Sequence, residues 1–179
     1  WGLVACQPSI DEQYAEANLA FQEDRYEQAI PIYEALLARQ LDDNMRANMY
    51  AKMGISYAYA GQYEKCTESI QRALEAKIDQ YEVYDMGALC HEHLKQPDKA
   101  MVLYKEGIEK FPDRYEFKNR AAISAFRNKD VNQAMEWLAE LAEKNPKNVD
   151  WNYSAGTVAE ELKNYKQAEL YYRRVLEQK

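Results

Sequence analysis

Small apolar residues recur along the chain at a regular spacing, and a larger apolar residue follows each pair of them. In the stretch 84–112, Ala88 precedes Ala100 by twelve residues, and Tyr104 follows four residues later. From Cys66 onward the second small residue recurs every 34 residues, after a first step of 37 from Ala29. A period in this range predicts a stack of similar structural units. The other four sets are Ala17, Ala29 and Tyr33; Gly54, Cys66 and Ile70; Ala122, Ala134 and Leu138; Gly156, Ala168 and Tyr172.

Two helices in each unit account for this pattern. A small residue on each helix lets the two backbones approach closely, and the larger residue fills the space where the next unit stacks. Neither helix is long enough to be stable alone in water, so the stability has to come from stacking. We therefore expect ten helices in five antiparallel pairs, with the two small residues of each set in close contact. Ser9 and Glu12 have the spacing of a capping box, which predicts that the first helix begins there.

The period and its columns of small and aromatic residues resemble those of the tetratricopeptide repeat (TPR) family, from Ile10 to the end of the chain. The resemblance implies an all-α fold, a right-handed helical solenoid of about five helix-turn-helix hairpins. It places a TPR domain at residues 10–179, with repeats at about 10–43, 46–80, 81–114, 115–148 and 149–179.

Composition and charge narrow the classes of partner. The net charge of −7 argues against nucleic acid, because phosphate binding needs clustered Lys and Arg. The same acidity disfavours attraction to anionic lipid. The longest apolar run is far shorter than a membrane span.

The first residues indicate processing and an anchor. Leu3-Val4-Ala5-Cys6 resembles the lipobox of bacterial lipoproteins, in which a signal peptide is cut before a cysteine that then carries lipid. Residues 1–6 are then the end of a signal peptide, and residues 7–9 form a short linker. The resemblance implies a periplasmic location in the bacterial cell envelope, on the outer membrane rather than the inner. The alternative is that these residues have no such role and that the chain is a soluble cytoplasmic adaptor or co-chaperone.

Two other cysteines and two histidines are candidates for a disulfide or a metal site. Cys66 and Cys90 are expected to be small buried residues, since free cysteine behaves as a small hydrophobe. A disulfide between them is the alternative, in an oxidising periplasm and with Cα atoms within about 7 Å. His91 and His93 point to different faces of a helix, so only Cys90 and His93 could share an ion, and we expect no metal site.

The sequence contains no glycine-rich phosphate loop and no nucleophile elbow, and it has only two histidines. We therefore expect a protein that is not an enzyme and that has no cofactor and no small-molecule substrate.

The remaining candidate site is the concave groove that the first helix of each hairpin lines in the TPR family. Aromatic and arginine side chains dominate binding energy at interfaces, so they are the better contact candidates. Arg120 and Arg127 would suit a carboxylate of the partner, or would instead pair with Glu160 and Glu161. Leu89 either contacts the partner or packs between neighbouring helices. The groove residues are Tyr14, Asn18, Phe21, Tyr59, Leu89, His93, Arg120, Arg127 and Tyr153.

These observations predict a non-catalytic scaffold for protein–protein interaction. The expected form is a lipid-anchored TPR protein of the bacterial envelope, attached through Cys6, that assists assembly of a membrane complex.

Overall fold

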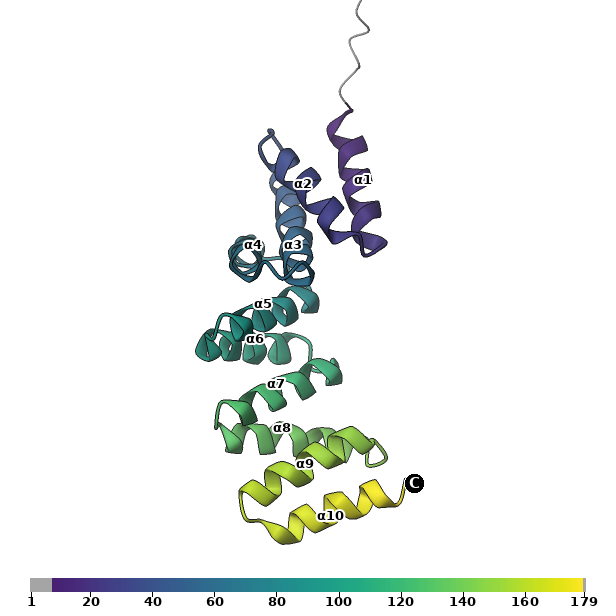
Figure 1. Ribbon diagram of the computed structural model, residues 1–179, viewed down its shortest axis with the longest axis vertical. Helices are drawn as coiled ribbons and strands as arrows, with labels where there is room; N and C mark the ends of the chain where they lie inside the picture. Colours follow the sequence, from purple (N-terminus) through teal and green to yellow (C-terminus); the bar gives the residue numbers. More distant parts are fainter. Residues whose placement is uncertain (1–7, 179) are drawn as a thin grey trace, which may run out of the picture. The chain divides into compact units, whose positions relative to one another are not determined.

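The computed structural model describes residues 8–178. Within this range the chain forms ten α-helices and no strand, as the repeat pattern predicts (Figure 1). The helices are α1 (Ile10–Gln22), α2 (Tyr26–Leu37), α3 (Asp43–Tyr59), α4 (Tyr63–Glu75), α5 (Tyr81–His93), α6 (Pro97–Lys110), α7 (Tyr115–Arg127), α8 (Val131–Lys144), α9 (Val149–Glu161) and α10 (Tyr165–Leu176).

The helices group into two compact units. Unit 1 ends at Gln96 and contains α1 to α5, and unit 2 begins at Pro97 and contains α6 to α10. Inside each unit every helix packs on the next, and first helices also pack on first helices, α3 on α5 and α7 on α9. This is the packing of a helical solenoid, in which each repeat contacts its neighbours. The boundary between the two units falls within the predicted repeat 81–114, with Ala88 in unit 1 and Ala100 in unit 2. The contact expected between these two residues therefore stays a prediction.

The first helix begins where the capping box predicted it. The backbone N–H of Glu12 donates to the Ser9 hydroxyl at 3.2 Å, and the Ser9 N–H donates to the Glu12 carboxylate at 2.8 Å. Two backbone donors that the helix leaves unpaired are thereby satisfied.

Every turn inside a hairpin closes with one residue in the left-handed conformation. These residues are Asp24, Gly61, Lys95, Lys129 and Lys163, with φ between 57° and 70°. The N–H of the next residue donates to the carbonyl five residues before it, as from Asp130 to Ala125 at 2.9 Å. This is the Schellman geometry, which favours glycine because glycine has no Cβ to strain.

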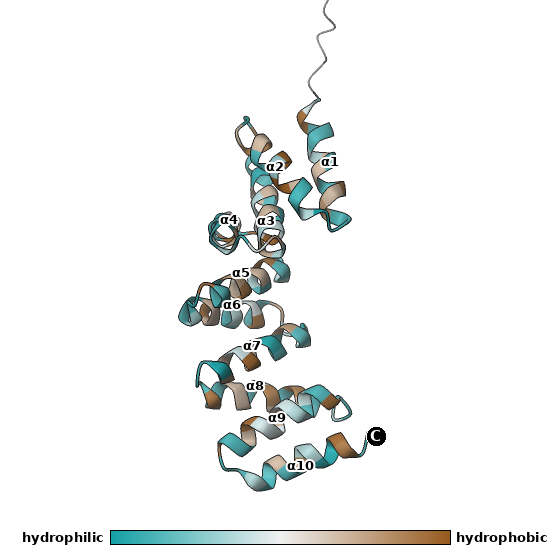
Figure 2. Cartoon of the chain, in the orientation of Figure 1, coloured by the Kyte–Doolittle hydropathy of each residue, from teal (hydrophilic) through white to brown (hydrophobic). Residues whose placement is uncertain are grey.

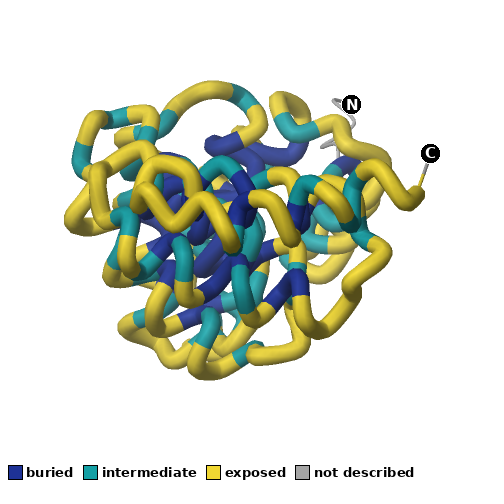
Figure 3. The backbone as a smooth tube through the Cα atoms, turned by 90° about the horizontal axis from the view of Figure 1, so that it is seen from below, coloured by how far each residue is buried: buried dark blue, intermediate teal, exposed yellow. Residues whose placement is uncertain are grey.

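The small-residue columns lie in the core, as expected. Ala17, Ala29, Ala122 and Ala134 are fully buried, and Figure 3 shows most of the exposed backbone in the turns and on the outer sides of helices. The approach is close at Gly54, because an added Cβ would lie 2.8 Å from Cδ1 of Ile70 and one of the two would have to shift. The larger residue of the motif thus fills the space that the small one leaves open.

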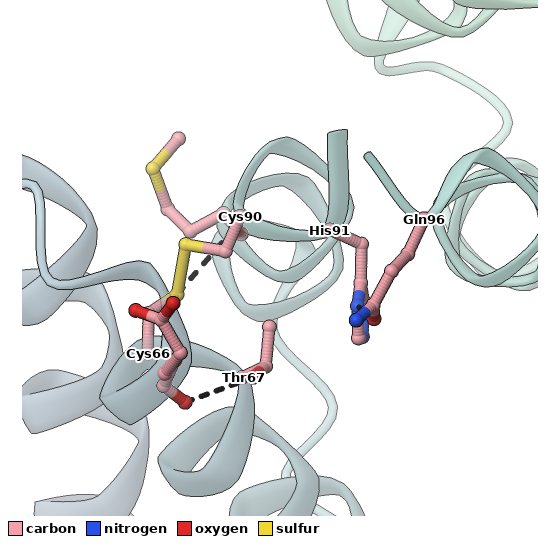
Figure 4. The surroundings of a disulfide bond; sticks show 7 residues. Cys66, Thr67, Cys90, His91 and Gln96 are labelled. Carbon is pink, nitrogen blue, oxygen red and sulfur yellow. Dashed lines mark hydrogen bonds between the residues drawn. A yellow bond between two sulfur atoms is a disulfide. The ribbon is translucent and has the colours of Figure 1, made fainter. Parts of the chain in front are cut away.

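The two internal cysteines form a disulfide, so the expectation of two separate thiols is wrong (Figure 4). Cys66 on α4 and Cys90 on α5 are both fully buried, as predicted for small core residues. Their Cα atoms are 6.5 Å apart, within the range that a disulfide spans. The bond joins one hairpin of unit 1 to the first helix of the next. The spacing of the repeat could not show that the two positions meet across this junction.

Among residues 8–178, no helix is both long enough and apolar enough to cross a bilayer.

Candidate protein-binding surface

Lys52 is the centre of a polar and aromatic cluster on α1 and α3. Its ammonium group donates to the amide oxygen of Asn18 at 2.6 Å, and the Tyr33 hydroxyl donates to the same oxygen at 2.9 Å. The ammonium nitrogen also lies 5.6 Å from the ring centre of Tyr14 and 5.9 Å from that of Phe21. Both distances are in the range of cation–π attraction. The structure therefore brings together three of the predicted groove residues, Tyr14, Asn18 and Phe21.

Burial alters the chemistry of this lysine. Desolvation lowers the pKa of Lys52, because removal from water penalises the charged form. Lysine has three N–H donors, and the bond to Asn18 uses one of them. The half-buried ammonium group, flanked by aromatic rings, can therefore donate to a carbonyl or carboxylate oxygen of a partner.

Tyr59 contributes an exposed aromatic surface beside this cluster. Its ring stacks on Tyr26 with centroids 4.5 Å apart and an interplanar angle of 6°, and Phe21 meets Tyr26 edge-on at 5.6 Å. Tyr59 stays 60% exposed. The Tyr26 hydroxyl donates to Asp24 at 2.6 Å, and burial together with this bond raises the pKa of Tyr26. A shallow pocket of about 310 Å³ opens between Tyr26, Tyr59 and Asp24.

A second stacked pair occupies the equivalent place one repeat later. The rings of Tyr63 and His93 lie parallel with centroids 4.1 Å apart. Tyr63 begins α4 as Tyr26 begins α2, and His93 ends α5 as Tyr59 ends α3. Leu89, one turn before His93, is half-buried.

The second-helix members of these contacts, Tyr26, Tyr33 and Tyr63, were not predicted as part of the surface. A signal for two of them exists in the sequence. Tyrosine is the first residue of the second helices α2, α4 and α10, which makes it a column of the repeat. The groove that the resemblance implies is lined by first helices, so residues of second helices were not among the predicted contacts.

In unit 2 the predicted residues lie on two first helices, α7 and α9. Arg120 and Arg127 are exposed on α7, and Tyr153 on α9 is 60% exposed. The Tyr153 ring lies 5.9 Å from that of Tyr172. Within residues 8–178 no carboxylate is paired with Arg127. Arg127 is therefore an exposed cation of α7, and Tyr153 an exposed aromatic residue of α9.

The alternative pairing of the arginines with glutamates finds no support at Arg127. Glu160 instead accepts a hydrogen bond of 3.1 Å from the Tyr172 hydroxyl. A buried cation of α7, Lys118, does pair with a glutamate, Glu140 at 2.7 Å.

The disulfide removes a metal ligand from the cluster formed by Cys90, His91 and His93. The sulfur of Cys90 is bonded to Cys66 and is no longer a thiolate, the form that binds metal. His91 lies 2.9 Å from the side-chain oxygen of Gln96 (Figure 4). Among the described residues, no three His, Cys, Asp or Glu side chains lie together as a metal site requires.

Comparisons with known proteins agree with this architecture. Models of the tetratricopeptide repeat match residues 14–51, 93–154 and 152–179. A comparison with curated proteins finds no match. The solved structure of YrrB, described as a TPR protein with an unusual peptide-binding site, has a TM-score of 0.79 and 18% identity. That alignment covers 96% of this chain and 87% of YrrB.

Two structures of MamA are also similar. Each has a TM-score of 0.82, with 17% and 15% identity. The alignments cover 94% of this chain in both cases, and 90% and 91% of MamA. Identities this low show the fold alone. The repeat models, the period of the small-residue columns and the ten packed helices lead to one conclusion: the chain belongs to the tetratricopeptide repeat family.

Proposed function

We propose that this protein is a non-catalytic scaffold of the bacterial envelope that binds a segment of a protein partner along its first helices. Lipid on Cys6 holds it at the periplasmic side of a membrane, where it assists assembly of a membrane complex. TPR domains bind protein partners, and the proposed binding of a partner segment rests on this property.

The Cys66–Cys90 disulfide carries the proposal for the compartment. Disulfides form and persist in oxidising places such as the bacterial periplasm and are rare in the cytosol. Both cysteines are fully buried in the core, so the bond is part of the packing between two hairpins. The disulfide supports a periplasmic protein over a cytoplasmic adaptor.

The anchor rests on the lipobox, Leu3-Val4-Ala5-Cys6, which lies outside the described residues. The chain has three cysteines, and two of them pair with each other, so Cys6 is the one that stays outside this bond. Two or three acyl chains on one cysteine would hold the protein stably, whereas one chain gives marginal binding.

The contacts of unit 1 support recognition of an extended peptide. Lys52 offers donors to a backbone carbonyl or a carboxylate, and Tyr14 and Phe21 beside it offer apolar faces. Tyr59 adds an exposed ring at the edge. Aromatic and cationic side chains of this kind are the usual anchors of interfaces. YrrB, which has a similar fold, is described as having a peptide-binding site.

In unit 2, Arg120 and Arg127 supply a second place for an acidic group of the partner. Arg-to-carboxylate contacts are charge-assisted and can be bidentate, so lysine should substitute poorly at these positions.

Thiol counting and intact-mass analysis test the anchor and the compartment together. Protein purified from its native membrane should show no free thiol before reduction, two after reduction, and the added mass of acyl chains on Cys6. Cys6→Ser should move the protein from the membrane pellet to the soluble fraction. Three free thiols in a protein found in the cytosol would end the proposal.

The binding surface is tested by capture of the partner from detergent-solubilised envelope, followed by affinity measurements. Lys52→Met, Arg120→Ala and Arg127→Ala should each weaken binding, with about a tenfold loss or more at a hot spot. Lys105→Ala, on the second helix α6, is the matched control and should bind as the wild type does. If all three variants bind like the control, the partner does not use the first helices.

A further inference from the structure

Cations of unit 1 lie over several of its aromatic rings. The ammonium nitrogen of Lys65 is 5.2 Å from the ring centre of Tyr57, and the guanidinium carbon of Arg72 is 5.4 Å from that of Tyr50. Both distances are in the range of cation–π attraction. Together with the contacts of Lys52, they show that this unit repeatedly places a cation against an aromatic face.

The contact at Tyr57 combines a ring, a carboxylate and a cation. The Tyr57 hydroxyl donates to the carboxylate of Glu34. The ammonium group of Lys65 lies 3.5 Å from the same carboxylate oxygen and also over the Tyr57 ring. The cation is therefore attracted at once by an opposite charge and by the electron-rich face of the ring.

A pocket at the turn between α1 and α2 has the ring and the carboxylate of this arrangement. We call it the turn pocket; it has a volume of about 310 Å³ and is lined by Asp24, Tyr26, Glu27 and Tyr59. The Tyr26 hydroxyl donates to Asp24 at 2.6 Å, and its ring stacks on that of Tyr59, which is 60% exposed. Among residues 8–178, no cation of the chain lies over either ring.

The rim of the turn pocket carries an excess of negative charge. Asp24 and Glu27 are exposed, and within the described part of the chain neither is paired with a cation. Arg25 also lines the pocket, but its guanidinium group is paired with Glu23 and donates to Gln28 at 2.7 Å. Figure 2 shows this turn and the start of α2 as hydrophilic.

We propose that the turn pocket binds an arginine side chain of the partner segment. The guanidinium group stacks on the exposed ring of Tyr59 and pairs with the carboxylates of Asp24 and Glu27. Arginine suits this place better than lysine, because its planar group stacks on aromatic faces and forms two parallel hydrogen bonds with a carboxylate.

This inference rests on the proposed function and adds one side chain to the description of the segment. Phe21 connects the two places, since its ring lies 5.9 Å from the ammonium nitrogen of Lys52 and 5.6 Å from the ring of Tyr26. The segment then carries an oxygen acceptor for Lys52 and an arginine close to it.

The first experiment uses the tripeptide Gly-Arg-Gly, blocked at both ends, and the whole protein with isotope-labelled tyrosines. We expect saturable changes in the nuclear magnetic resonance signals of the Tyr26 and Tyr59 rings as the tripeptide is added. The same peptide with citrulline in place of arginine is nearly identical in shape and uncharged, and it should leave these signals unchanged.

Two variants test the contacts. Asp24→Asn/Glu27→Gln removes both charges, and Tyr59→Leu removes the aromatic face. Each should weaken binding of the tripeptide about threefold or more. Circular dichroism should be that of the wild type, because all three side chains are exposed.

Tyr165→Leu is the matched control and should leave the affinity unchanged. Tyr165 begins α10 as Tyr26 begins α2, and it is 65% exposed. It is followed by Lys166, whereas Tyr26 is followed by Glu27, so its surroundings lack the second carboxylate.

Equal changes with the citrulline peptide, no change at Tyr26 and Tyr59, or an equal loss in Tyr165→Leu would overturn the inference. The captured partner separates it from the proposed function. If Lys52→Met weakens binding of the partner and Asp24→Asn/Glu27→Gln does not, the turn pocket holds no arginine of the segment, while the binding surface stands. If both variants weaken it, the inference is supported.

Discussion

The ammonium group of Lys52 on α3 and the amide oxygen of Asn18 on α1 are joined by a hydrogen bond of 2.6 Å. The same oxygen accepts a hydrogen bond from the Tyr33 hydroxyl on α2, so one amide group links side chains from three helices. These contacts hold the ammonium group of Lys52 in a fixed position, and in that position it loses part of its hydration.

This cost leads to a prediction on Lys52. Burial lowers its pKa, so in the alkaline range between the folded and unfolded pKa values the unfolded state binds more protons, and stability rises with pH. Below the folded pKa, including neutral pH, the whole desolvation cost is present. Lys52→Met should therefore retain the wild-type melting temperature at pH 7 or raise it, while it weakens partner binding. Thermal unfolding at pH 7 checks this, and a clear loss of stability would contradict it.

The disulfide between Cys66 and Cys90 should contribute strongly to the stability of unit 1. The two residues are 24 apart in sequence, and a loop of this length corresponds to about 3.5 kcal/mol in the chain-entropy model. We expect the double variant Cys66→Ala/Cys90→Ala to lose about that amount in urea unfolding. Reductant should lower the stability of the wild type and leave the double variant unchanged. A wild type indifferent to reductant after full thiol release would contradict this role.

The turns inside the hairpins offer a stabilising substitution. Lys129 has a φ of 68°, where a side chain is strained and glycine is not. Lys129→Gly should raise the free energy of unfolding by about 1 kcal/mol. The same change at Lys105, in the interior of α6, should lower it by about 1 kcal/mol. Urea unfolding of the two variants gives opposite signs if the turn geometry is correct.

The close approach within the second hairpin is tested at Gly54. Helix propensity alone would make Gly54→Ala stabilising by about 1 kcal/mol. The new Cβ would however lie 2.8 Å from Cδ1 of Ile70, which is buried, and such overpacking costs about 1–3 kcal/mol. We therefore expect a net loss of stability or none of the expected gain.

Ile70→Val provides the second arm of this experiment, because it removes the Cδ1 methyl that the new Cβ would meet. The loss in the double variant Gly54→Ala/Ile70→Val should be smaller than the sum of the two single losses. Additive losses would mean that the Cδ1 methyl of Ile70 does not limit the approach of the two helices.

The repeat spacing was enough to predict the helices and the small-residue core, and its resemblance to the tetratricopeptide repeat predicted the family. Ala17, Ala29, Ala122 and Ala134 could be placed in the core because a fixed period repeats the same local environment. The capping box at Ser9 is equally local, since both of its partners lie within one turn of α1. Such features depend on residues that are close in sequence, so the pattern of residues along the chain is enough to predict them.

Contacts between different hairpins were decided by the tertiary structure. Cys66 meets Cys90, and Tyr63 stacks on His93, only because α4 packs on α5 with a particular rotation and offset. The sequence allowed both the separate thiols and the bonded pair, since periodicity gives the face of each helix and not the distance between two side chains. Lys52 likewise gains its partner Asn18 and its lowered pKa from the packing of α3 beside α1. Distance and desolvation are properties of the packed state, so they first appear when the helices are assembled.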